Sequence, residues 1–147
     1  MLIITNLHRN YVNSKINTSY LSKYVSNIDY SELTNTILEL NSNSFIYLSY
    51  EGNEEIYNFE KRLRKTIKQY DLEDNFIYVN CSTVINEDST ISSLKNILST
   101  GNSNIILPAI IYFKDNEPID YIDSLEGLLS IGSFQQLLDK YELEGSN

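Results

Sequence analysis

The residues able to carry out redox or metal chemistry are few in this chain. It has one cysteine, Cys81, and one histidine, His8. Because a disulfide needs two sulfurs, no intramolecular disulfide can form, which excludes a disulfide-stapled secreted scaffold. The two residues do not stand at a spacing typical of metal ligands, so we expect no metal site and no cofactor. Cys81 ends an apolar stretch without a basic neighbour, which favours an inert buried thiol over a reactive one.

A second candidate for function is the turn in FIYLSYEGNEEIYNFEKRLRKTIKQY, residues 45–70, where a buried strand leads into an amphipathic helix. Asn53-Glu54-Glu55-Ile56 could form a loop that contacts a partner. It could equally be a helix start, with Asn53 as the N-cap and two acids complementing the helix dipole. Further along, the basic residues of 61–68 are typical of a solvated helix face, or they could bind an acidic partner or RNA.

The charge balance restricts the kinds of partner that the chain can bind. Its 147 residues carry 20 acidic and 11 basic side chains, a net charge of −9 at pH 7. A nucleic-acid-binding protein needs a basic surface that displaces counterions from phosphates, so we expect no nucleic-acid partner. We expect a protein or peptide partner, and the sequence leaves self-association into a homo-oligomer open.

Hydropathy indicates a cytoplasmic protein. After Met1 only three apolar residues, Leu2–Ile4, are consecutive, too few for the core of a signal peptide. No stretch has the length needed to span a bilayer. An anchor removed from upstream of Met1 would leave the same sequence.

The elements that must position these residues follow from periodicity and turn signals. Apolar residues alternate in the expected strands and recur at three- and four-residue steps in the expected helices. The expected strands cover 20–28, 44–50, 76–79, 109–113 and 118–123, and the expected helices cover 30–40, 56–70, 89–99 and 133–142. Asp29 and Ser133 open two of the helices as N-caps of capping boxes.

This order predicts a three-layer α/β sandwich with a mixed sheet that ends in a C-terminal antiparallel hairpin. Residues 20–143 form the domain, 1–19 an N-terminal extension and 144–147 a frayed tail. The apolar segment 124–132 either folds onto the core or forms a partner-binding patch.

The order of elements resembles the thioredoxin fold. Leu107-Pro108 resembles the family's loop proline, which stands before the hairpin and is usually cis, and 114–117 resembles its hairpin turn. Within the family, the chain looks closest to bacteriocin-transport accessory proteins. The family's two cysteines fall on Asn53 and Ile56, so the resemblance does not imply dithiol exchange here. It implies a surface at Asn53–Ile56 and Leu107-Pro108 that docks extended polypeptide.

The resulting expectation is a redox-inactive thioredoxin-like adaptor, not an enzyme, accessory to a bacterial secretion or transport system. Two alternatives remain open at this point. One is an enzyme that uses Cys81 as a single thiol. The other is a structural subunit that assembles through residues 1–19.

Overall fold

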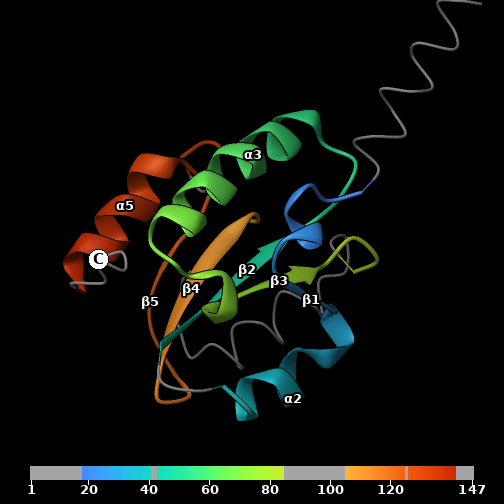
Figure 1. The fold of residues 1–147 in the computed structure, drawn as a ribbon. Coiled ribbons are helices and arrows are strands. Elements are labelled where there is room, and N and C mark those ends of the chain that lie inside the picture. The colour runs from blue at the N-terminus through green and yellow to red at the C-terminus, as the bar shows by residue number, and fades with distance from the viewer. Residues whose placement is uncertain (1–17, 41–42, 85–104, 125, 142–147) are drawn as a thin grey trace, which may run out of the picture.

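The computed structural model describes residues 18–40, 43–84, 105–124 and 126–141. Within them, five strands form one mixed sheet in the order β1-β3-β2-β4-β5 (Figure 1). The strands are β1 (Ser26–Asp29), β2 (Asn43–Ser49), β3 (Phe76–Asn80), β4 (Ala109–Lys114) and β5 (Glu117–Ile122). β3 runs parallel to β1 and β2, whereas β4 is antiparallel to both β2 and β5. The predicted mixed sheet with a C-terminal hairpin is confirmed.

Helices cover both faces of this sheet. The helices are α2 (Leu33–Leu38), α3 (Glu54–Gln69) and α5 (Ile131–Lys140), with short 3₁₀ turns η1 (Leu21–Lys23), η2 (Tyr30–Glu32) and η3 (Glu73–Asn75). α3 and α5 lie on one face, and α2 lies on the other (Figure 1). The three layers of the predicted sandwich are therefore present.

The central strand β2 explains why the two faces form separate cores. Its side chains alternate, with Phe45 and Tyr47 packing toward α3 and α5, and Ile46 and Leu48 packing toward α2. All four are fully buried. A strand covered on both faces needs such a continuous apolar run, and it places the end of β2 rigidly between the layers.

Helix α3 follows the predicted apolar stripe, with Ile56, Phe59, Leu63 and Ile67 buried against the sheet. Glu60 is also buried within this stripe, at 1% exposure. The sequence analysis did not anticipate this burial.

The strand predicted over 20–28 is wrong in its first half. Residues Leu21–Lys23 form the 3₁₀ turn η1, and the strand begins only at Ser26. Tyr20 and Tyr24 are four residues apart, as are Leu21 and Val25, and this spacing puts side chains on one face in a helix and in a strand alike. The helix predicted over 30–40 is likewise shorter, because it begins as the turn η2 before α2.

The last helix begins earlier than predicted. Ser130 is the N-cap, its Oγ accepts a hydrogen bond from the Ser133 N–H at 3.1 Å, and the helix starts at Ile131. The predicted cap, Ser133, follows Gly132 and lies three residues too late, because the helix already includes Gly132.

Two predicted elements, the helix over 89–99 and the tail 144–147, lie outside the described residues, as does the N-terminal extension apart from Thr18 and Ser19. Of the helices that the structure describes, none combines the length and apolarity needed to cross a membrane.

Candidate functional site

The turn after β2 and the loop before β4 lie at the same end of the sheet. In the antiparallel pair of β2 and β4, Leu48 is opposite Ala109. The chain therefore leaves β2 toward Asn53 where it enters β4 from Pro108. We call this end, formed by residues 51–56, 106–108, 123–124 and 126–130, the Pro108 end. The Leu107-Pro108 peptide bond is cis, as the resemblance implied.

Asn53 is the N-cap of α3, as one interpretation of the turn predicted. Its Oδ1 accepts a hydrogen bond from the Ile56 N–H at 3.0 Å. Glu54 and Glu55 form the exposed first turn of the helix, whereas Ile56 is 3% exposed and supports the turn from below. Of the four predicted residues, the two acids are thus the ones presented to solvent.

The turn is attached to the neighbouring strand β3. The Glu51 N–H donates to Ser82 Oγ at 2.9 Å, and the Asn80 side-chain amide donates to the Glu51 carboxylate. Gly52 has a φ of +90°, a backbone conformation that favours glycine. These bonds fix the turn to the end of β3, on the side of β2 that faces away from β4.

The Pro108 loop is held by Ser124, which sequence reasoning did not single out. The Ser124 hydroxyl donates to the Pro108 carbonyl at 2.8 Å and accepts from the Leu129 N–H at 3.1 Å. The Ser124 N–H also donates to the Ile106 carbonyl at 3.1 Å. Pro108 is buried and Leu107 half-buried, while the neighbouring Ile106 is 40% exposed.

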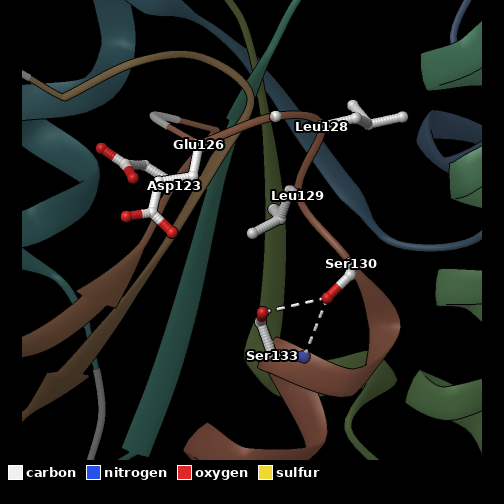
Figure 2. Close-up of a pocket in the computed structure, with 7 residues that line it drawn as sticks. Asp123, Glu126, Leu128, Leu129, Ser130 and Ser133 are labelled. Carbon is white, nitrogen blue, oxygen red and sulfur yellow. Dashed lines mark hydrogen bonds between the residues drawn. The ribbon is translucent and has the colours of Figure 1, made fainter.

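An open hollow of about 400 Å³ adjoins this loop. Figure 2 shows acidic side chains on one side of the hollow and the hydroxyls that begin α5 on the other. The lining residues are Asp123, Glu126, Gly127, Leu128, Leu129, Ser130 and Ser133. Leu128 is 37% exposed and Leu129 is buried at 3%, so this loop both covers core and offers apolar surface. Leu129 thus folds onto the core, as one interpretation of segment 124–132 predicted, whereas a partner-binding role for the segment stays a prediction.

Cys81 is not exposed at the Pro108 end. Its side chain is fully buried in the core beneath α2, and its thiol lies 3.8 Å from the Val79 carbonyl oxygen that accepts its hydrogen bond. Burial raises the pKa of the Cys81 thiol to about 12. A thiol that is neither ionised nor exposed is a poor nucleophile. His8 lies outside the described residues.

Among the described residues, no group of three or more His, Cys, Asp or Glu side chains is arranged so that it could hold a metal ion.

A buried polar cluster surrounds Glu60, and the sequence analysis did not predict it. The Glu60 carboxylate accepts hydrogen bonds from the Ser19 hydroxyl, from the Leu21 N–H at 3.0 Å and from the Tyr47 hydroxyl at 3.1 Å. Burial raises the pKa of the Glu60 carboxyl, and the bonds from Ser19, Leu21 and Tyr47 offset part of that effect. The cluster fastens η1 to α3.

Comparison with known proteins identifies the fold of this chain but does not assign it to a family. No protein-family model matches the chain, and no curated protein matches it. Among solved structures, thioredoxin f2 of Chlamydomonas reinhardtii matches with a TM-score of 0.56 at 10% identity, covering 81% of this chain and 97% of that one. Oxidised thioredoxin of Plasmodium falciparum matches with a TM-score of 0.54 at 17% identity, covering 80% and 97%. At such identities the likeness concerns the fold, which is thioredoxin-like.

Proposed function

We propose that this protein is a redox-inactive adaptor that docks an extended polypeptide segment at the Pro108 end of its thioredoxin-like fold. The observation that carries the proposal is the pairing of Leu48 with Ala109, which sets the turn at Asn53–Ile56 beside the cis Leu107-Pro108 loop. No sulfur lies in that turn, because the chain's one cysteine is buried elsewhere.

The surface chemistry of the Pro108 end favours a particular class of segment. Ile106 and Leu128 are partly exposed apolar side chains, and Glu54 and Glu55 are exposed acids. An apolar side chain flanked by lysine or arginine would complement this combination. In the described chain, neither the N–H nor the C=O of Leu107 hydrogen-bonds to another described residue, which leaves both groups for the backbone of an incoming strand.

The accessory role in a bacterial secretion or transport system, in the cytoplasm, is part of the same proposal. Its support is the sequence resemblance to bacteriocin-transport accessory proteins. The partner would then be a protein or peptide, and neither nucleic acid nor a bound cofactor is invoked.

The test is affinity capture from lysate and solubilised membranes of the source organism, read by mass spectrometry. The wild-type protein is compared with Glu54→Lys/Glu55→Lys. The matched control, Glu32→Lys/Glu39→Lys, makes the same charge change at exposed positions on the α2 side. Urea unfolding of each variant confirms that the fold is intact.

We expect a partner that wild type and control retain and that the Glu54/Glu55 variant loses. Equal retention by all three proteins would show that this surface does not bind the partner. A partner lost by both variants would indicate net charge rather than docking at the Pro108 end.

The burial of Cys81 and the raised pKa of its thiol argue against the alternative of a single-thiol enzyme. The alternative of a subunit assembling through residues 1–19 falls mostly outside the described residues. Deleting that segment and measuring the mass in solution would test it.

A further inference from the structure

A second surface, on α3 and η1 and away from the hollow at the Pro108 end, gathers basic and aromatic side chains. We call it the basic–aromatic face. Its members are Tyr20, Tyr24, Tyr57, Lys61, Arg64, Lys65 and Lys68. Tyr20 and the four basic residues line an open hollow of about 320 Å³.

The cations of this face are held by rings. The Arg64 guanidinium carbon lies 3.4 Å from the centre of the Tyr24 ring, and an Arg64 N–H donates to the Tyr20 hydroxyl at 3.4 Å. The Lys61 ammonium lies 5.1 Å from the Tyr57 ring centre and 5.9 Å from that of Tyr20. Cation–π contacts of this kind orient a charge without neutralising it.

The charge of the face is only partly compensated, by Glu73, which lines a neighbouring hollow together with Arg64 and Lys68. None of its four cations forms an ion pair with a described carboxylate, whereas Lys140 is paired with Asp120 at 2.7 Å. The chain as a whole carries 20 acidic residues and only 11 basic ones. Concentrating four of the 11 cations on one helix face, unpaired, is unexpected in such an acidic protein.

The buried Glu60 cluster fixes the aromatic half of the face. By accepting from the Leu21 N–H and the Ser19 hydroxyl, Glu60 anchors η1 against α3. Tyr20 and Tyr24, which flank η1, are thereby set over Lys61 and Arg64. The rings pack on one another, with the centres of Tyr20 and Tyr24 5.3 Å apart and those of Tyr20 and Tyr57 5.6 Å apart. The face is thus preorganised rather than a loose set of lysines.

We propose that the basic–aromatic face binds an acidic segment of extended polypeptide. Lys61 and Lys65 are one helical step of four residues apart, a rise of about 6 Å. Alternate side chains of an extended peptide are about 6.7 Å apart, so carboxylates at every second position match these ammonium groups. The tyrosine rings cover the apolar parts of such a segment.

An acidic peptide fits better than a nucleic acid. The remaining chain has seven basic residues for its 20 acids. A long polyanion that continued past the face would meet this negative surface and be repelled. A short acidic segment ends within the face and avoids the repulsion. This inference is independent of the proposed function, because the two surfaces differ in residues and in charge.

The test measures binding of a fluorescein-labelled peptide of about ten residues with glutamate at alternate positions. Fluorescence anisotropy is recorded at about 50 mM and about 300 mM NaCl, since screening weakens such contacts. A glutamine version of the peptide and an oligouridylate of equal length serve as probes of charge and of nucleic acid.

The variants are matched in charge. Lys61→Glu/Lys65→Glu alters the face, and Arg62→Glu/Lys114→Glu makes the same change at exposed positions outside it. Lys61→Gln/Lys65→Gln is included in case the reversal unfolds the protein. Amide NMR shifts of the wild type with the peptide locate the site without any substitution.

We expect salt-sensitive binding of the glutamate peptide that weakens at least about tenfold in the Lys61/Lys65 variants and less than about twofold in the control. Shift changes should centre on Tyr20, Tyr24 and α3. Absent binding, equal weakening in the control, or shift changes at Asp123–Ser130 instead would overturn the proposal. Tighter binding of oligouridylate than of the glutamate peptide at the same residues would show that the face binds nucleic acid rather than an acidic peptide.

Discussion

Replacing Glu60 by alanine should destabilise the protein through three donors at once. The Ser19 hydroxyl, the Leu21 N–H and the Tyr47 hydroxyl all donate to its carboxylate. Ser19 is 4% exposed, and Leu21 and Tyr47 are fully buried, so water cannot replace the lost acceptor without opening the structure. Glu60→Ala therefore leaves three buried donors without an acceptor.

The magnitude follows from these contacts. A buried polar group left without a partner costs about 1–3 kcal/mol, so three such groups cost at least about 3 kcal/mol. Removing a desolvated carboxylate returns part of that cost, and the cavity left by its side chain adds to it. We expect a net loss of about 3 kcal/mol in the free energy of unfolding. A domain of this size has about 5–15 kcal/mol, so the variant should still fold.

Urea unfolding followed by circular dichroism and tyrosine fluorescence measures this loss. The chain has 12 tyrosines and no tryptophan, so tyrosine emission is the available intrinsic signal. Amide hydrogen exchange adds a local readout. Exchange at Leu21 should accelerate more than exchange in β2, because the Leu21 N–H loses its acceptor directly.

Lys65→Ala is the control, since it truncates an exposed side chain on the same helix. A loss below about 1 kcal/mol for Glu60→Ala would refute the reasoning, because it would mean that the three donors find other acceptors. So would Leu21 exchange that rises only in step with global unfolding. A double-mutant cycle with Tyr47→Phe should show coupling, since both changes remove the same hydrogen bond.

Three further predictions concern the helix start, the thiol and the buried acid. Asn53→Ala should lower the free energy of unfolding by about 1 kcal/mol in urea titrations, because the Ile56 N–H loses the side chain that caps it. Asn53→Ser should retain most of the wild-type stability, because serine can also cap the helix. Equal stability of wild type and both variants would contradict the capping role. Raising the thiol pKa from 9.0 to about 12 makes the Cys81 thiolate about 1000-fold rarer. Iodoacetamide at pH 8 should therefore alkylate the native protein at least that much more slowly than the urea-unfolded protein. Native and unfolded rates within about tenfold of each other would show an accessible thiol. Burial raises the pKa of the folded Glu60 carboxyl above its ordinary 4.5. In urea titrations, the free energy of unfolding of wild type relative to Glu60→Gln should therefore fall as pH rises above 4.5. An increase in that relative stability over the same pH range would show that the fold favours the ionised carboxylate instead.

Periodicity predicted the central elements because their burial is uniform. β2 is apolar on both faces, and α3 carries one continuous stripe, so local sequence and tertiary packing agree. The hairpin turn could be predicted from its own residues, independently of packing. Asp115 and Asn116 both adopt positive φ values, 53° and 69°, which their short polar side chains tolerate.

Prediction failed where the local pattern had two interpretations. The four-residue steps from Tyr20 to Ile28 fit a strand as well as a helix, and the first part of this segment is a 3₁₀ turn held by Glu60. The start of α5 was misplaced because Ser130 and Ser133 are both good caps, and only the tertiary position of Ile131 against the core decides between them.

The Glu60 cluster could have been found from the sequence. Glu60 lies four residues after Ile56 and three before Leu63, within the apolar stripe of α3. A charge at that position predicts a buried group with partners. Which partners it has cannot be read from the sequence, because Ser19 and Leu21 are about 40 residues away and reach Glu60 only through the fold.

The two outer strands of the described sheet bear on how copies of this protein meet. β5 carries Pro118, which has no N–H, and its pairing with β4 is interrupted by an irregularity at Tyr112 and Phe113. At the opposite edge, β1 is only four residues long and exposes Ser26, Asn27 and Asp29. Neither edge offers a long regular ladder to another chain, so fibril-like strand addition is disfavoured. Self-association through the described residues would then have to proceed through side chains, and it would respond to salt and to surface charge rather than to backbone pairing.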